Sequence, residues 1–198
     1  RQMDLMSMVY GGLLDAVTIP QGQLPVPFGG RSGPYSLEVA LARFVAGADA
    51  VIHCAGTVRG RTRDDFYPAN VSGVENLLAA LHRHNPDARL LALSSLAARH
   101  PQLSHYAASK QLGEAALIKG AANLRYAMLR PPAVYGPGDQ ELLPLFKAMK
   151  LGIAPIPGRI DGRMSLIHVD DLVRAMIAWL ESAAVPREIF TLADPTPG

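Results

Sequence analysis

The chain has 198 residues, of which 49% are hydrophobic and 18% charged, and it contains one cysteine. This composition is typical of a globular protein and excludes a disordered or collagen-like chain. A single cysteine excludes an internal disulfide and a cysteine-based zinc site, and we expect a reducing, cytoplasmic environment and no bound metal. The formal net charge is only +2, without a block of like charge, which argues against nucleic acid as a partner. No apolar run reaches the roughly 18 residues of a membrane span, so no membrane association is expected.

From about residue 36 onward, apolar segments with strand character alternate with segments of helical periodicity. This alternation is typical of βαβ units and predicts an α/β fold, in which helices cover both faces of a parallel sheet. Asp170 is the expected N-cap of the last helix, and the breaker-rich stretch 131–138 is expected to be a loop. The predicted helices span 36–46, 64–84, 104–119, 140–150 and 170–181, and the predicted strands span 50–54, 89–93, 125–129 and 165–169.

Tyr106 and Lys110 are four residues apart in a predicted helix, so their side chains share one face of it. A tyrosine phenol titrates at about pH 10 and is a poor base at neutrality, but a neighbouring ammonium group stabilises the phenolate and lowers its pKa. Ser95 follows a predicted strand and can add a hydrogen bond to the same substrate oxygen. The pair alone is weak evidence, because a surface tyrosine beside a solvated lysine is common. The surrounding motifs must therefore decide between the two readings.

Those motifs resemble the extended short-chain dehydrogenases/reductases of the NAD-dependent epimerase/dehydratase type. Six segments resemble the family's motifs, in the family's order, between about residues 36 and 194: His53-Cys54-Ala55-Gly56, Asn70-Val71-Ser72-Gly73, Leu93-Ser94-Ser95, Tyr106-Ala107-Ala108-Ser109-Lys110, Arg130-Pro131-Pro132-Ala133-Val134-Tyr135-Gly136-Pro137 and Leu166-Ile167-His168-Val169-Asp170-Asp171.

The resemblance implies a Rossmann-like domain over 35–198, with part of a substrate-binding region from about residue 137. It also implies NAD or NADP as cofactor, a small-molecule substrate such as a nucleotide sugar or a related hydroxy or keto compound, and a homodimer formed by the helices at about 64–84 and 104–119. Tyr106 would exchange a proton with the substrate, Lys110 would tune Tyr106 and bind the nicotinamide ribose, and Ser95 would orient the reacting oxygen. The residues implied to line the cofactor are Cys54, Ala55, Gly56, Asn70, Ser94, Tyr106, Lys110, Pro131, Pro132 and Val134.

The chain departs from the family pattern at its start, because the G-x-x-G-x-x-G turn that holds the dinucleotide pyrophosphate is missing. Residues 1–34 are left unassigned. Three alternatives remain open: an epimerase, dehydratase or reductase, a catalytically silent binding or regulatory relative, and an incomplete fragment of such an enzyme. The residue that would distinguish NAD from NADP normally follows the missing turn, so the choice of cofactor also stays open.

Overall fold

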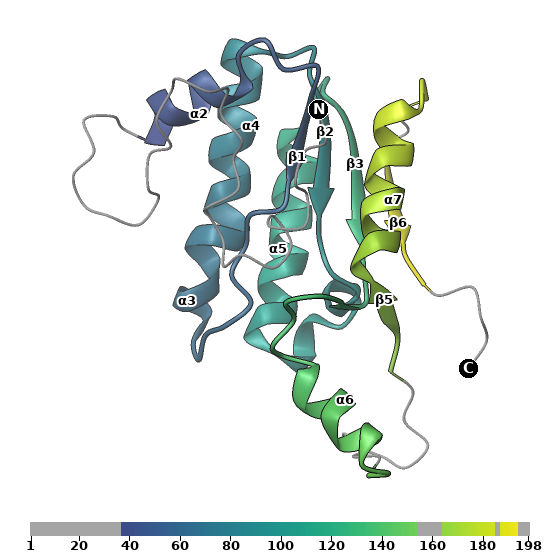
Figure 1. Ribbon diagram of the computed structural model, residues 1–198. Coiled ribbons are helices and arrows are strands. Elements are labelled where there is room, and N and C mark those ends of the chain that lie inside the picture. The colour runs from purple at the N-terminus through teal and green to yellow at the C-terminus, as the bar shows by residue number, and fades with distance from the viewer. Residues whose placement is uncertain (1–36, 154–163, 185–186, 194–198) are drawn as a thin grey trace.

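Figure 1 shows the computed structural model, which describes residues 37–153, 164–184 and 187–193. Its main sheet has four parallel strands in the order β1-β2-β3-β6, and a second, two-stranded parallel sheet pairs β4 with β5. The strands are β1 (Ala50–His53), β2 (Arg89–Leu93), β3 (Arg125–Arg130), β4 (Ala133–Tyr135), β5 (Leu166–His168) and β6 (Glu188–Thr191).

Helices cover both faces of the main sheet, with α2, α4 and α5 on one face and α7 on the other (Figure 1). The predicted α/β fold with a Rossmann-like parallel sheet is thereby confirmed. The helices are α2 (Leu37–Val45), α3 (Arg63–Tyr67), α4 (Gly73–His84), α5 (His105–Gly120), α6 (Leu143–Lys150) and α7 (Val169–Glu181).

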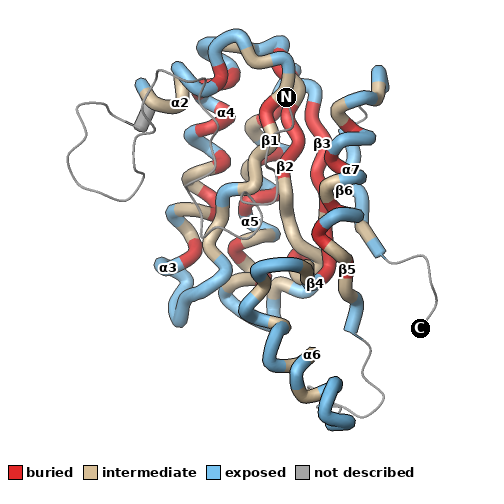
Figure 2. Tube along the Cα trace, in the orientation of Figure 1, coloured by how far each residue is buried: buried red, intermediate tan, exposed pale blue. Residues whose placement is uncertain are grey.

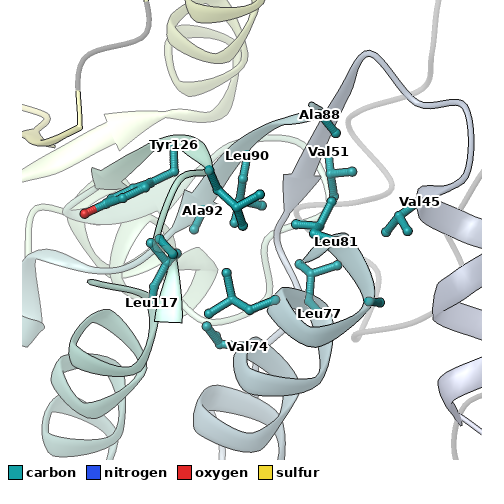
Figure 3. Close-up of a cluster of buried hydrophobic side chains, with 14 of the residues drawn as sticks. Val45, Val51, Val74, Leu77, Leu81, Ala88, Leu90, Ala92, Leu117 and Tyr126 are labelled. Atoms are coloured by element: carbon teal, nitrogen blue, oxygen red, sulfur yellow. The ribbon is translucent and has the colours of Figure 1, made fainter. Parts of the chain in front are cut away.

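Each central strand supplies alternate side chains to two separate cores, which explains why β2 and β3 read as nearly continuous apolar runs. From β2, Leu90 packs toward α4 and α5, in the cluster that Figure 3 draws, whereas Leu91 packs toward α7. In β3, Tyr126 and Met128 alternate in the same way with Ala127. Figure 2 shows the consequence, a buried central sheet between helices whose outer faces are exposed.

The predicted helix over 64–84 is interrupted. The chain forms α3, then a π-helical turn at Pro68–Ser72, and only then α4. Asn70 and Val71, inside this turn, are buried. Periodicity did not reveal the interruption, because a π-helical turn keeps apolar side chains on the buried side while it changes the backbone hydrogen bonding.

Two further predictions need correction or extension, and one strand was missed. Asp170 is not the N-cap of α7, because His168 has the extended backbone of a cap and its Nδ1 accepts a hydrogen bond from the Asp170 N–H at 3.2 Å. The stretch 131–138 contains the short strand β4, which pairs with β5. Strand β6 was not predicted at all. Residues 1–34 lie outside the described part of the chain.

Helix α6 contains no buried residue and lies beyond the carboxyl ends of the main strands (Figures 1 and 2). Within the described residues, no helix is both long and apolar enough to span a membrane. Strands β1, β2 and β3 end at the same edge of the sheet, and the loops that follow them carry most of the residues singled out from the sequence.

Candidate active site

The site lies at the carboxyl ends of β1, β2 and β3, where ligands bind in open parallel sheets. Residues 54–57 leave β1, Ser94 and Ser95 leave β2, and Pro131 and Pro132 leave β3. Backbone hydrogen bonds join two of these loops: the Leu96 N–H donates to the Pro131 carbonyl at 2.8 Å. The first turn of α5 lies beside these loops.

Tyr106 stands in that first turn. The Ser104 hydroxyl caps α5 by accepting from the Ala107 N–H at 3.0 Å. The side chains of Tyr106 and Ser95 are hydrogen-bonded, and the Tyr106 ring packs against Phe66 with ring centroids 6.1 Å apart. The structure therefore brings together the two hydroxyl groups that the sequence proposed as partners at a substrate oxygen.

Lys110 follows one turn later on the same helix face. Its ammonium group donates a hydrogen bond to the Leu93 carbonyl at 2.8 Å, which anchors α5 to the end of β2. Burial lowers the pKa of Lys110 from its ordinary value of 10.5 to about 8, although the nearby Glu114 carboxylate opposes the shift. Two N–H donors of the ammonium group remain for other acceptors.

The sequence predicted that Lys110 lowers the pKa of Tyr106, and here the structure differs. Burial raises the pKa of Tyr106 above 10.0, and the hydrogen bond with Ser95 opposes that rise. Lys110 does not reverse it, because its ammonium group points to the Leu93 carbonyl. In the chain alone, Tyr106 therefore keeps its proton at neutral pH and is a proton donor rather than a base.

Glu114 was not anticipated from the sequence. It is buried, and it accepts hydrogen bonds from the Ser94 hydroxyl at 2.5 Å and from the Arg130 guanidinium at 2.8 and 2.5 Å. The carboxylate thus ties α5 to the ends of β2 and β3. Its spacing was the available signal, because Tyr106, Lys110 and Glu114 recur every four residues along one helix stripe.

Asn70 holds the loop after β1 against α5. Its amide oxygen accepts from the Thr57 N–H at 2.8 Å, and its amide nitrogen donates to the Thr57 carbonyl at 3.0 Å and to the Ser109 hydroxyl at 2.8 Å. A Cβ on Gly56 would lie 2.8 Å from that amide oxygen, so a larger residue would displace the Asn70 amide from the loop. The amide proposed to line a cofactor is thus engaged within the protein, where it positions the loop.

His53 and Cys54 are poor candidates for chemistry of their own. Burial lowers the pKa of His53 to about 4 and raises that of Cys54 to about 11, so both are neutral at pH 7. The adjoining Ala55 is exposed. Among the residues that the structure describes, no group of three or more His, Cys, Asp and Glu side chains is placed to hold a metal ion.

The loop after β3 is largely packed. Pro131 and Pro132 are buried, and Val134 in β4 packs against the core on the α7 side of the sheet. The Ser94 hydroxyl is also committed, since it donates to Glu114. Of the residues that the sequence assigned to the cofactor, the structure thus leaves Ala55, Tyr106 and Lys110 with the most accessible or uncommitted groups.

Comparison with known proteins decides the family. Residues 33–193 match the profile of the NAD dependent epimerase/dehydratase family. The chain belongs to this family.

The chain is similar to three further proteins. A ceramide reductase from Caulobacter vibrioides (strain NA1000 / CB15N) is 41% identical over 149 residues, which cover 75% of this chain and 45% of the relative. A 2-alkyl-3-oxoalkanoate reductase from Stenotrophomonas maltophilia (strain K279a) is 29% identical over 73% of this chain and 50% of the relative. A UDP-glucuronic acid 4-epimerase from Bacillus cereus, solved in complex with NAD, has the same fold, with a TM-score of 0.65 at 21% identity over 79% of this chain and 57% of its own. The chain spans about half the length of these curated relatives.

The described residues fit the nicotinamide half of a dinucleotide. Lys110 offers ammonium N–H donors near Gly56 in the loop after β1. Tyr106 precedes it by one turn of α5, and the Tyr106 hydroxyl interacts with that of Ser95. The glycine-rich turn that holds the pyrophosphate is missing from the sequence. The donor set thus suits the reacting end of the cofactor.

Proposed function

We propose that this chain carries the catalytic residues of an NAD(P)-dependent oxidoreductase that reduces a ketone, or oxidises the corresponding secondary alcohol. The observation that supports it most is the hydrogen-bonded pair of Ser95 and Tyr106 beside the anchored Lys110. The family match and the two relatives named as reductases support the same reaction class.

Tyr106 is the proton donor in the direction of reduction. Its raised pKa keeps the phenol protonated, so the phenol can transfer a proton to the oxygen of a ketone as that oxygen becomes an alcohol. Ser95 holds the same oxygen by a second hydrogen bond. Lys110 would bind the nicotinamide ribose and orient it toward the substrate carbon. A bound reduced nicotinamide supplies the hydride.

Several features of the proposed site act through position rather than contact with substrate. Glu114 fixes Ser94 and Arg130, and Asn70 fixes the loop after β1. Reactions of this kind depend on geometry, because a small misplacement of reacting atoms costs a large factor in rate. Epimerisation and dehydration of a nucleotide sugar share the same first hydride transfer, and they remain alternative outcomes of the assays.

The test is the Tyr106→Phe variant. It removes one hydroxyl from a ring whose packing against Phe66 does not need it. Ketone-dependent oxidation of NADH or NADPH, followed by absorbance, should fall about 10²- to 10⁴-fold. Tyr67→Phe is the matched control. Tyr67 ends α3, and the Arg63 guanidinium carbon lies 5.3 Å from the centroid of the Tyr67 ring. Loss of the Tyr67 hydroxyl should leave the rate unchanged.

Calorimetric titration with NAD(H) and NADP(H) separates this proposal from a catalytically silent relative. The parent chain is expected to bind one of the two cofactors, and the Lys110→Met variant is expected to bind that cofactor more weakly. No binding of either cofactor at millimolar concentration would refute the enzymatic role of the chain in favour of a binding or regulatory one.

A further inference from the structure

An open cleft of about 600 Å³ adjoins the proposed site, and Tyr106 forms part of its wall. We call it the Tyr106 cleft. Its volume lies in the range of roughly 300–1,000 Å³ typical of small-molecule pockets. Four segments distant in sequence build it: the loop after β1, α3, the short helical turn before α5, and the first turn of α5. Its apolar and aromatic wall residues are Val58, Phe66, Pro101, Leu103, Tyr106 and Ala108.

Two of these side chains are far more exposed than apolar residues usually are. Val58 is 66% exposed and Leu103 is 74% exposed, although they come from separate segments and line the same cleft. Single exposed apolar residues need no explanation, but apolar residues that converge beside reactive hydroxyl groups indicate a binding surface.

The side chains that line the cleft disfavour one class of ligand. The lining contains no lysine, arginine, aspartate or glutamate. A nucleotide sugar carries a diphosphate, which proteins hold with arginine, lysine or the N-terminus of a helix. The first turn of α5 lines the cleft, but the N–H groups of Ala107 and Ala108 already donate to Ser104. The neighbouring segment carries three arginines outside the lining, Arg59, Arg61 and Arg63. Arg59 pairs with Glu141, and Arg63 lies over the ring of Tyr67.

We propose that the Tyr106 cleft binds the aliphatic chain of a lipid-like ketone or secondary alcohol, with the functional carbon held next to Tyr106. This proposal rests on the function proposed above and names its substrate class. In the reduction, a hydride from the reduced nicotinamide bonds to the carbonyl carbon, and the carbonyl π pair takes the proton from the Tyr106 hydroxyl. The ketone becomes the alcohol, the nicotinamide is oxidised, and the phenolate regains a proton from water.

The experiment measures binding without relying on turnover. Isotope-labelled protein is titrated with 2-hexanone, 2-octanone and 2-decanone, and the amide shifts of the cleft segments are followed by NMR. Burial of each methylene should improve affinity about fourfold, so each step of two carbons should improve it about 15-fold. UDP-glucose should neither shift these amides nor displace 2-decanone. Affinity independent of chain length, or displacement by UDP-glucose, would overturn the proposal.

A pair of variants locates the site. Leu103→Lys should weaken 2-decanone binding at least tenfold, because it puts a charge where the chain lies. Leu151→Lys is the matched control: Leu151 is 77% exposed and lies outside the lining, so binding should stay within about twofold of the parent chain. An equal effect of both variants would show that the ketone binds elsewhere.

The two proposals fail in different ways. If alkanones bind as expected but neither nicotinamide cofactor binds, the oxidoreductase assignment fails and the apolar site stands. If the reduced cofactor is oxidised by UDP-linked keto sugars and alkanones do not bind, the site assignment fails and the reaction class stands.

Discussion

Lys110 is held in a place that disfavours its charge. Burial lowers its pKa from 10.5 to about 8, even though Glu114 lies close enough to raise it and the Leu93 carbonyl accepts a hydrogen bond from the ammonium group. A residue whose charge destabilises the fold, at a position central to the proposed chemistry, is typical of functional sites. The cost should be visible in the stability of the protein.

We predict that Lys110→Met stabilises the folded state at pH 7 by roughly 2 kcal/mol, allowing for partial solvent access and the lost hydrogen bond. The pKa is lower in the folded state than in the unfolded state, so the destabilisation is full below pH 8. It disappears as the pH rises from about 8 to 10.5, and the gain from the substitution should disappear with it. Urea unfolding at pH 7 and at pH 10.5 measures the difference in free energy of unfolding between Lys110→Met and the parent chain. Lys119→Met, at an exposed position on α5, should show no comparable change; a constant gain for Lys110→Met would contradict the prediction.

At the residue scale, sequence motifs identified Ser95, Tyr106 and Lys110, and the structure places them together. Their proposed roles remain predictions. The direction of the Tyr106 pKa was wrong, because a helical spacing says which side chains share a face but not which acceptor an ammonium group finds. Glu114 was missed for a related reason: its partners, Ser94 and Arg130, come from two strands whose adjacency only the fold reveals.

At the element scale, periodicity and breakers predicted most helices and strands, and β2 was predicted with the bounds that the structure shows. Strands β4 and β6 were not predicted. Strand β4 follows Pro131 and Pro132, which favour a loop, and its pairing with β5 is visible only in the fold. Strand β6 pairs with β3, a partner that is also known only from the fold. The π-helical turn before α4 was also missed, because its apolar side chains keep the helical pattern. This turn is in close contact with α5.

That close contact depends on Gly113 of α5. A Cβ there would lie 2.2 Å from the Asn70 carbonyl oxygen, which belongs to the backbone of the π-helical turn and cannot rotate away. We predict that Gly113→Ala destabilises the fold by about 2–4 kcal/mol, despite the better helix propensity of alanine. Thermal and urea unfolding would measure the loss.

Gly73→Ala is the matched control for this prediction. Gly73 is the first residue of α4, and its nearest contact would be the Pro68 carbonyl at an ordinary 3.7 Å. The substitution should therefore be neutral or stabilise by up to about 1 kcal/mol. If both variants unfold at the same denaturant concentration, the close packing of α5 on the π-helical turn does not limit stability.

At the scale of the whole molecule, the two faces of the sheet are covered differently. Among the described residues, α7 covers one face, whereas α4 and α5 lie side by side on the other face (Figure 1). The sequence predicted both layers, because βαβ units place their helices on the faces of a parallel sheet. The strand order β1-β2-β3-β6 follows chain order, since each crossover leads to the neighbouring strand.

The outer surface of α5 exposes Leu112 by 38% and Ile118 by 53%. We predict that two copies of the chain pack their α4–α5 surfaces together around a two-fold axis, because a stable interface needs about 800 Å² from each partner and two adjacent helices can supply it. Light scattering at micromolar concentration should give about twice the 21.2 kDa of one chain.

The double variant Leu112→Lys/Ile118→Lys should give the monomer mass with unchanged circular dichroism. Ile177→Lys, on the opposite face of the sheet in α7, should remain dimeric. A parent chain that is monomeric would contradict the predicted dimer. A double variant that is still dimeric would show that α4 and α5 are not the interface, because a lysine pair cannot be buried between symmetric copies without repulsion.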